Sequence, residues 1–192
     1  MYWRGSGLRG LPSCGCGFEV LYFSVTGGSK RCLSAHITDG TVSTFTIRRA
    51  TAADAEQVRT LLTANALPLE GLTPGLEHFL VAHDRDVIVG AIGLELYPPL
   101  ALLRSAVVTE AYRKTGLGSH LVQSIEDLAR FAGIQRLILL TTTAERFFQN
   151  RGYRKIRREV VSGPVTASPE FTSACPSTAV CMEKQLDSAS AS

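Results

Sequence analysis

The chain has 192 residues, of which 45% are hydrophobic and 19% charged, and its formal net charge at pH 7 is +3. This length fits one domain with a buried core, and so mild a charge gives no reason to expect a nucleic-acid partner. No apolar run approaches the roughly 18 residues of a membrane helix, so we expect no membrane partner.

Residues 1–43 differ from the rest of the chain. They are rich in Gly and Ser and show no sustained helical or strand period, apart from a strand fragment at Phe18 to Val25. They also lack the apolar core and cleavage site of a secretory signal. We expect an irregular extension, either disordered or read from an upstream start codon. The predicted folded domain covers residues 44–187, and residues 188–192 form a tail.

The cysteines predict a reducing compartment. Their number is odd and no signal peptide precedes them, which argues against a disulfide framework and favours the cytoplasm. Cys14 and Cys16 could form a soft-metal pair, but no second Cys/His pair follows at zinc spacing, so we expect incidental thiols and no metal. The full set is Cys14, Cys16, Cys32, Cys175 and Cys181.

The first elements of the predicted domain alternate between strand and helix. Phe45 to Arg49 has the pattern of a strand. Thr51 and Asp54 have the spacing of a capping box, which predicts a helix that buries an apolar face and ends before Pro68. Residues 78–83 and 87–96 then predict two strands around a tight turn.

Pro98 and Pro99 separate the last of these strands from the next one, Leu100 to Thr109. A tight connection makes the two strands an antiparallel hairpin, which places Glu95 within one or two residues of being opposite Leu103 and Arg104.

Two helices and three strands complete the predicted domain. Apolar residues predict a helix over residues 117–131, with Leu117, Leu121, Ile125, Leu128 and Ala132 on its buried face. Arg136 to Leu140 predicts a strand buried on both faces and parallel to a neighbour. Thr142 and Glu145 predict a short helix that Gly152 ends. Residues 153–160 and 178–185 predict strands, joined by a loop over residues 161–176. The predicted fold class is α/β with a mixed sheet.

One loop predicts an anion site. Residues 113–118, Arg-Lys-Thr-Gly-Leu-Gly, lie between a predicted strand and a predicted helix. Such a loop points backbone N–H groups and the positive end of the helix dipole at one place. The spacing differs from the glycine pattern of dinucleotide-binding folds and lacks the end of a nucleotide P-loop. A solvated basic turn is the alternative interpretation of Arg113 and Lys114, and a solvated face is our interpretation of the basic run from Arg151 to Arg158.

The loop resembles the R/Q-x-x-G-x-G/A signature of the GNAT acyltransferase superfamily. A second segment, Ala144 to Tyr153, is similar to that family's A-x-x-F-Y-x-x-x-G-F pattern. The resemblance covers about three quarters of the chain and implies the GNAT fold, a central splayed mixed sheet flanked by helices. A narrower likeness is to GNAT N-acetyltransferases associated with bacterial arsenic-resistance operons. It rests on short runs: residues 93–95, 102–105, 139–148, Phe171, and 175–182.

The resemblance implies that acetyl-CoA binds as co-substrate. Backbone groups of residues 107–109 would hold the pantetheine arm, and the glycine loop would surround the pyrophosphate. The implied cofactor-binding residues are Val107, Val108, Thr109, Arg113, Lys114, Thr115, Gly116, Leu117, Gly118, Ser119 and Phe148. The family often has a tyrosine at the position of Phe148, whose phenol protonates the leaving thiolate. Cys175, Ser173 and Tyr112 are weak candidates to replace it.

Glu95 and Arg104 are the candidate residues for the acceptor. Acetyl transfer requires an unprotonated amine, so a nearby base assists the reaction. Glu95 is our candidate base, with an amine anchor or a structural ion pair with Arg104 as alternatives. Arg104 interrupts an apolar strand and needs a partner, either Glu95 or a substrate carboxylate. The loop over residues 161–176 is a further candidate part of the acceptor site.

The sequence therefore predicts an acetyl-CoA-dependent N-acetyltransferase. Its expected substrate is a small amine that carries a carboxylate, with a link to arsenic resistance. One rival is a coenzyme A-binding sensor without catalysis, and another is an acetyltransferase of protein amines. A homodimer is left open.

Overall fold

The structure is a computed structural model that describes residues 20–24, 31–38 and 41–186. Its sheet runs in the order β1-β2-β3-β4-β5-β6-β7-β9-β8. All neighbouring strands are antiparallel except β6 and β7, which are parallel. The strands are β1 Val20–Ser24, β2 Arg31–Thr38, β3 Thr41–Arg49, β4 Phe79–Asp84, β5 Val87–Tyr97, β6 Leu100–Val108, β7 Arg136–Thr141, β8 Arg154–Ile156 and β9 Val180–Gln185. The predicted α/β class with a mixed sheet is confirmed.

The N-terminal segment differs from our expectation of an irregular extension. β1 and β2 continue the sheet as antiparallel neighbours of β3. Ladder pairing can recruit a segment that has no hydrophobic period of its own. Residues 1–19, 25–30, 39–40 and 187–192 lie outside the described part of the chain. This includes Cys14, Cys16 and the predicted tail, and the domain boundary at residue 44 stays a prediction.

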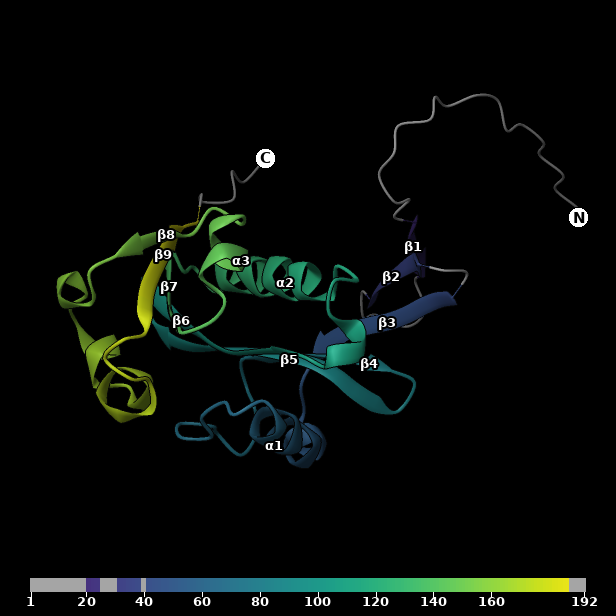
Figure 1. Cartoon of the computed structure of the whole chain (residues 1–192), viewed down its shortest axis with the longest axis horizontal. Helices are drawn as coiled ribbons and strands as arrows, with labels where there is room; N and C mark the ends of the chain where they lie inside the picture. Colours follow the sequence, from purple (N-terminus) through teal and green to yellow (C-terminus); the bar gives the residue numbers. More distant parts are fainter. Residues whose placement is uncertain (1–19, 25–30, 39–40, 187–192) are drawn as a thin grey trace, which may run out of the picture.

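Helices cover both faces of the sheet (Figure 1). α2 Leu117–Phe131 and α3 Glu145–Gln149 lie on one face, and α1 Ala55–Ala64 lies on the other. The buried face of α2 is rotated from our prediction: Val122 and Ala129 are buried, whereas Leu128 is half-buried and Ala132 is exposed. The helix crosses a twisted sheet, so its contact stripe follows the sheet and departs from the i, i+4 row that we chose.

β6 loses one of its two neighbouring strands halfway along its length. It pairs in parallel with β7 only from Leu100 to Leu103, opposite Arg136 to Leu139. Its register with β5 moves from Gly93↔Arg104 to Ala91↔Val107, so β6 has one extra residue there. Ser105 has a φ of 55°, a left-handed conformation that is uncommon for a residue other than glycine. This β-bulge bends β6 at the point where β6 and β7 separate.

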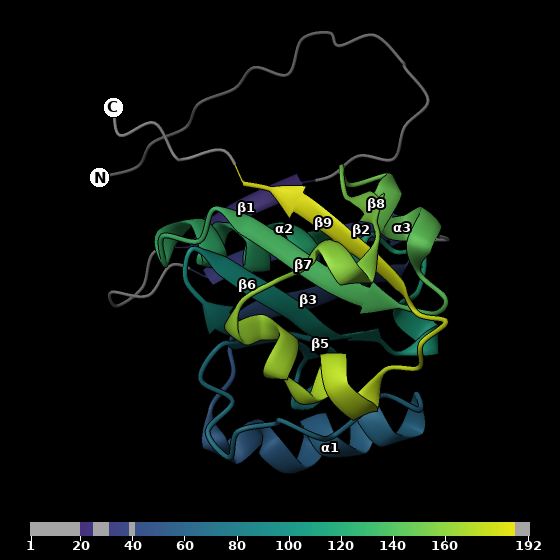
Figure 2. The same ribbon diagram turned by 90° about the vertical axis from the view of Figure 1, so that its left-hand side faces the viewer.

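The C-terminal part is less regular than the sequence predicted. β8 has only three residues, Arg154–Ile156, where we expected a strand over residues 153–160. Short helical turns follow: η3 Arg158–Val160, η4 Pro164–Ala167 and η5 Glu170–Ala174. Figure 2 shows these turns, coloured yellow-green, on the same side of the sheet as α1. The predicted cap of α3 is also wrong, because Thr141 Oγ1, not Thr142, accepts the N–H of Ala144 at 3.0 Å.

Candidate active site

Two adjoining cavities open where β6 and β7 separate. The larger one has a volume of about 900 Å³. Leu67, Ala106, Thr143, Ala144 and Phe148 line both cavities, so the two spaces meet beside the bulge in β6. The other residues that line the larger cavity are Asn65, Ala91, Ile92, Val107, Val108, Tyr112, Arg113, Lys114, Gly116, Gly118, Ser119, Leu121, Val122, Phe147 and Arg151.

The glycine loop forms one end of the larger cavity. Lys114 and Gly116 have φ angles of 67° and 88°, and Gly116 is the N-cap of α2. The carbonyl of Gly116 accepts the N–H groups of Ser119 at 2.8 Å and His120 at 3.1 Å. Among the described residues, the backbone N–H groups of residues 116–118 have no acceptor. Three such donors at a helix N-terminus form a site for an anion such as a pyrophosphate.

Gly118 allows a ligand to approach this loop closely. A Cβ at this position would lie 3.3 Å from the ring of Phe147 and 3.8 Å from Cγ2 of Val108. Contacts at 3.3 Å are tighter than most Cβ contacts in proteins, so a side chain here would displace Phe147 and occupy the space beside the free N–H groups. The residues that are present therefore fit the pyrophosphate of coenzyme A.

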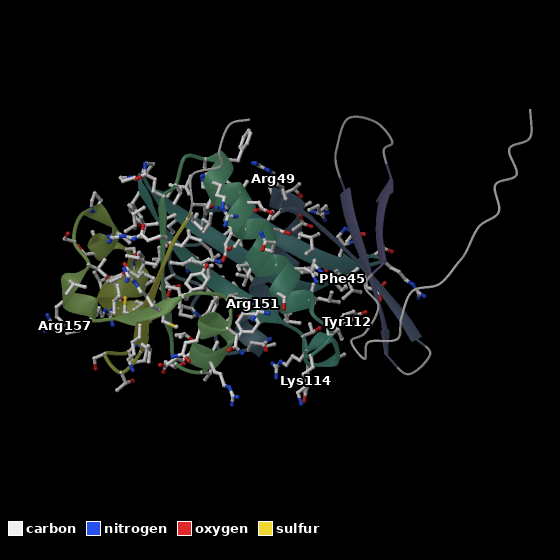
Figure 3. The ribbon with its side chains drawn as sticks, turned by 90° about the horizontal axis from the view of Figure 1, so that it is seen from above. Phe45, Arg49, Tyr112, Lys114, Arg151 and Arg157 are labelled. Atoms are coloured by element: carbon white, nitrogen blue, oxygen red, sulfur yellow. The ribbon has the colours of Figure 1, made fainter. Side chains whose placement is uncertain are left out.

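Three basic side chains line the larger cavity. Arg113 donates to Asn65 Oδ1 at 2.9 Å, while Lys114 makes no hydrogen bond or ion pair within the described residues. The Arg151 guanidinium lies over the Phe147 ring, 3.6 Å from its centroid, and also donates to Ser119 Oγ. Burial lowers the pKa of Arg151. Figure 3 shows Arg151 and Lys114 on one side of the molecule, with Arg157 at a distant end.

The position of Arg151 corrects our interpretation of the basic run as a solvated face. Arg151 follows α3 and turns back toward the N-terminus of α2, whereas Arg154 and Arg157 are exposed. The sequence offered one signal for this difference, since Arg151 belongs to the family-like segment that ends at Tyr153.

The predicted cofactor residues divide into two groups. The cavity is lined by Val107, Val108, Arg113, Lys114, Gly116, Gly118, Ser119 and Phe148. The side chains of Thr109, Thr115 and Leu117 do not line it. Leu117 is fully buried in the core, Thr115 Oγ1 donates to the carbonyl of Tyr112 at 2.7 Å, and the N–H of Thr109 donates to Val89 at 2.9 Å.

The smaller cavity has a volume of about 190 Å³. It lies on the far side of the bulge from the glycine loop, under the turn η5. The residues that line this cavity and not the larger one are Ala66, Pro68, Leu103, Arg104, Ser105, Leu139, Leu140, Thr141, Thr142, Glu170, Ala174, Cys175, Pro176 and Ala179. Arg104 and the loop over residues 161–176 are therefore brought together, as the sequence analysis expected of an acceptor site.

Arg104 carries a buried charge with several partners. Its guanidinium forms ion pairs with Glu95 Oε1 and, at 3.3 Å, with Glu170 Oε1. It also donates to the carbonyl of Glu70 at 2.5 Å and to Ser105 Oγ at 3.3 Å. The exposed fraction of its side chain is 0%. A buried guanidinium is tolerated because it is paired in this way.

Glu95 lies opposite Leu102, one residue from Leu103 and two from Arg104, as the hairpin predicted. Its Oε1 pairs with Arg104, and its Oε2 accepts the hydroxyl of Tyr97 at 2.8 Å. Burial, followed by this bond to Glu95, raises the pKa of Tyr97 to about 12. Glu95 lines neither cavity, and Gly71 packs against the pair, since a Cβ there would lie 3.2 Å from Glu95 Oε1. These contacts match the structural ion pair among our alternatives.

Each of the three candidate proton donors to the leaving thiolate is either hydrogen-bonded to a carboxylate already or lies outside both cavities. Tyr112 lines the larger cavity, but its hydroxyl donates to Asp84 Oδ2 at 2.5 Å, and this bond raises its pKa. Cys175 lines the smaller cavity and donates to Glu170 Oε2 at 2.9 Å. Burial, and then the bond to Glu170, raise the pKa of the Cys175 thiol to about 12. Ser173 is exposed and lines neither cavity.

The described part of the chain contains neither a cluster of metal ligands nor a helix that could cross a membrane. Within residues 20–24, 31–38 and 41–186, no three His, Cys, Asp or Glu side chains gather as metal ligands. No helix in this described part has the length and apolar character needed to cross a membrane. Cys175 and Cys181 are free thiols.

Comparisons with known proteins agree with this geometry. Residues 75–155 match the family model described as an acetyltransferase (GNAT) domain. An uncharacterized N-acetyltransferase of Chlorobaculum tepidum is 29% identical over 92 residues, which are 47% of this chain and 59% of the relative. An amino-acid acetyltransferase of Mannheimia succiniciproducens is 38% identical over 74 residues, which are 37% of this chain and 17% of the relative. The chain thus spans less than two thirds of each of these relatives.

A solved structure shows the same fold. It is an N-acetylglutamate synthase from Neisseria gonorrhoeae complexed with coenzyme A and N-acetyl-glutamate, with a TM-score of 0.64 and 21% identity. The likeness covers 74% of this chain and 35% of that one. The chain has the fold of this acetyltransferase, and residues 75–155 match the model of the GNAT acetyltransferase domain.

Proposed function

We propose that this protein transfers the acetyl group of acetyl-CoA to the amino group of a small acceptor. The observation that carries the proposal is the junction of the two cavities at the separation of β6 and β7. One cavity ends at free backbone N–H groups that suit a pyrophosphate, and the other contains charged groups that suit an amine. A ligand in each would bring its reacting end to the shared residues Ala106, Ala144 and Phe148.

The chain's own residues would act mainly by positioning. The N–H groups of residues 116–118 bind phosphate oxygens, and Lys114 adds a free positive charge beside them. The bulge at Ser105 interrupts the ladder and leaves Ala106 exposed between the cavities. Acetyl-CoA supplies a thioester, an acyl donor that needs no further activation by ATP. Holding two reactants in this way lowers the entropic part of the barrier.

An acceptor that carries a carboxylate is the finer part of the proposal. Support comes from the amino-acid acetyltransferase among the relatives. Arg104, our predicted anchor, already has two carboxylate partners, so an acceptor carboxylate would have to displace one of them. A link to arsenic resistance rests only on the short runs of sequence likeness.

The test is release of free thiol from acetyl-CoA by the full-length protein. The panel contains amino acids, amino-acid analogues with phosphinate or arsenic oxyanion groups, polyamines and peptides. Turnover with small amines supports the proposal, and preference for carboxylate-bearing amines supports its finer part. Turnover restricted to peptides would replace it with an acetyltransferase of protein amines.

A coenzyme A-binding sensor without catalysis is the second candidate. The observation in its favour is that Phe148 has no hydroxyl and that the hydroxyl of Tyr112 is engaged by Asp84. Binding of coenzyme A measured by calorimetry, with no thiol release from any member of the panel, would establish this candidate in place of the enzyme.

A further inference from the structure

We propose that Glu170, on the turn η5, binds the amino group of the acceptor and receives its proton. This inference rests on the proposed acetyl transfer and adds the residue on the acceptor side. It also replaces Glu95 as the carboxylate that faces the substrate.

Glu170 faces the smaller cavity from its η5 side. It is one of the residues that line this cavity, and the exposed fraction of its side chain is 9%. Its Oε1 lies 3.3 Å from Arg104, and its Oε2 accepts the Cys175 thiol at 2.9 Å. Two neighbours from different segments therefore fix the carboxylate in place. Such fixed geometry is what a group needs to orient a nucleophile.

The charges around Glu170 leave room for a cation. One guanidinium, that of Arg104, faces two carboxylates, those of Glu95 and Glu170, so the cluster has a net charge of −1 when all three are ionised. An ammonium group would pair with the carboxylate oxygens that Arg104 leaves uncompensated, because Arg158, the other cation nearby, binds backbone carbonyls and no carboxylate among the described residues. The other titratable groups nearby are Tyr97, which donates to Glu95, the neutral thiol of Cys175, and Arg158, which donates to the carbonyl of Phe171 at 2.5 Å and lies 3.4 Å from that of Glu170.

Glu95 forms an ion pair with Arg104, as Glu170 does, but it does not line the smaller cavity. Gly71 packs against the Glu95–Arg104 pair, since a Cβ on it would lie 2.6 Å from Arg104 and 3.2 Å from Glu95 Oε1, and the ring of Pro169 lies beside Gly71, 3.4 Å from the same position. An amine in the smaller cavity therefore meets Glu170 before Glu95. Substitutions of Glu95 and Glu170 can be compared directly, because each of these carboxylates forms one of the two ion pairs of Arg104.

In the proposed reaction the acceptor nitrogen loses two protons. The acceptor ammonium loses one proton to solvent, and the neutral nitrogen forms a C–N bond to the acetyl carbon while the C–S bond breaks. A second proton passes from nitrogen to Glu170 and then to the departing sulfur, which leaves as a thiol. The pKa of the Cys175 thiol, near 12, makes it a poorer proton donor to this sulfur than a protonated carboxyl group.

The decisive experiment compares Glu170→Gln with Glu95→Gln in the full-length protein. Each variant removes one carboxylate from Arg104, so the structural loss is shared, and thermal melting with calorimetry of coenzyme A checks folding in both. We expect Glu170→Gln to lower kcat/KM for the amine about 100-fold, to raise KM and to remove an acidic limb from the pH profile. We expect a smaller loss for Glu95→Gln. The reverse order of the two losses would overturn the inference.

Two further measurements cover other outcomes. If Glu170→Gln fails to fold, Glu170→Asp keeps the charge but shortens the side chain, and it should still raise KM; an unchanged KM would overturn the inference. If no amine is turned over although coenzyme A binds, the proposed acetyl transfer and the proton transfer to Glu170 are rejected, and only the amine-binding part of the inference is still tested, by titrating ethanolamine into the protein saturated with coenzyme A. Binding of ethanolamine, lost in Glu170→Gln and kept in Glu95→Gln, supports this part, and no binding to the wild-type protein rejects it. Failure to bind coenzyme A would instead reject the proposed function.

Discussion

The two cavities differ in how the chain builds them. The phosphate-binding end of the larger cavity comes from one continuous stretch, the loop over residues 113–118 and the first turn of α2. The charged cluster beside the smaller cavity comes from the hairpin of β5 and β6 and from η5, which is distant from that hairpin in the sequence. The first site depends on local backbone geometry, whereas the second depends on three segments packing correctly. Substitutions at the first site are therefore expected to act through the loop itself, and substitutions at the second site through contacts between segments.

The largest effect is expected at Gly118. Replacing it with leucine should weaken coenzyme A binding by at least about 100-fold, because the side chain meets Phe147 and fills the space that the pyrophosphate needs. Calorimetric titration with coenzyme A measures this. Gly133→Ala is the matched control. It lies at the other end of α2, where a Cβ meets nothing within 4 Å, and its φ of 75° should cost about 1 kcal/mol of stability without changing affinity. Unaltered affinity in Gly118→Leu would remove the larger cavity as the cofactor site.

A smaller effect is expected at Lys114. Its exposed ammonium lies beside the free N–H groups and has no partner among the described side chains. Lys114→Glu should weaken coenzyme A binding about 10-fold at low salt, and the loss should shrink as salt screens the charges. Lys155→Glu, an exposed lysine outside both cavities, is the control. Equal losses in the two variants would mean that only net charge matters.

The smaller cavity can be tested through the reactivity of Cys175. Burial and Glu170 raise its pKa to about 12, so the thiol should react slowly with iodoacetamide at pH 8. Glu170→Gln lowers the pKa by removing the negative neighbour, and alkylation should become a few-fold faster. Mass spectrometry of the peptide that contains Cys175 separates it from the other cysteines. An equal acceleration in Glu95→Gln would show that the thiol senses loosened packing and not the charge of Glu170.

The smallest effect on either cavity is expected at Asp54. Its carboxylate binds Arg48 at 2.7 Å and the N–H of Thr51 at 2.7 Å, confirming the capping box. The bond to Arg48 holds its pKa below the ordinary range. Asp54→Ala should lower the free energy of unfolding by about 1–2 kcal/mol at pH 7 and leave coenzyme A affinity unchanged.

The pH dependence of this loss follows from the sign of the shift. A lowered pKa in the folded state stabilises the protein above about pH 4, the ordinary value, and this stabilisation disappears as the pH falls further. Urea unfolding of both proteins at pH 7 and pH 3 should show a smaller difference at pH 3. A difference that grows on acidification would contradict the ion pair.

The sequence by itself determined the features that depend on neighbouring residues. The period of α2, the apolar run of β7, the cap at Thr51 and the glycine loop all follow from local propensity and spacing. The hairpin also placed Glu95 near Arg104, because a tight turn fixes the register of its strands. The resemblance of two segments, residues 113–118 and 144–153, to GNAT motifs then implied the fold of the sheet and its helices.

Only the tertiary structure decided which charged groups from distant segments meet. It turned Arg151 toward the glycine loop, and it brought Glu170 from an irregular turn to Arg104. It also added a bulge to β6 and set β1 and β2 beside β3. None of these contacts has a periodic signal, because each depends on the packing of segments that are far apart in the chain. The glycine loop could be found from its own residues, whereas the acceptor carboxylate required the folded chain.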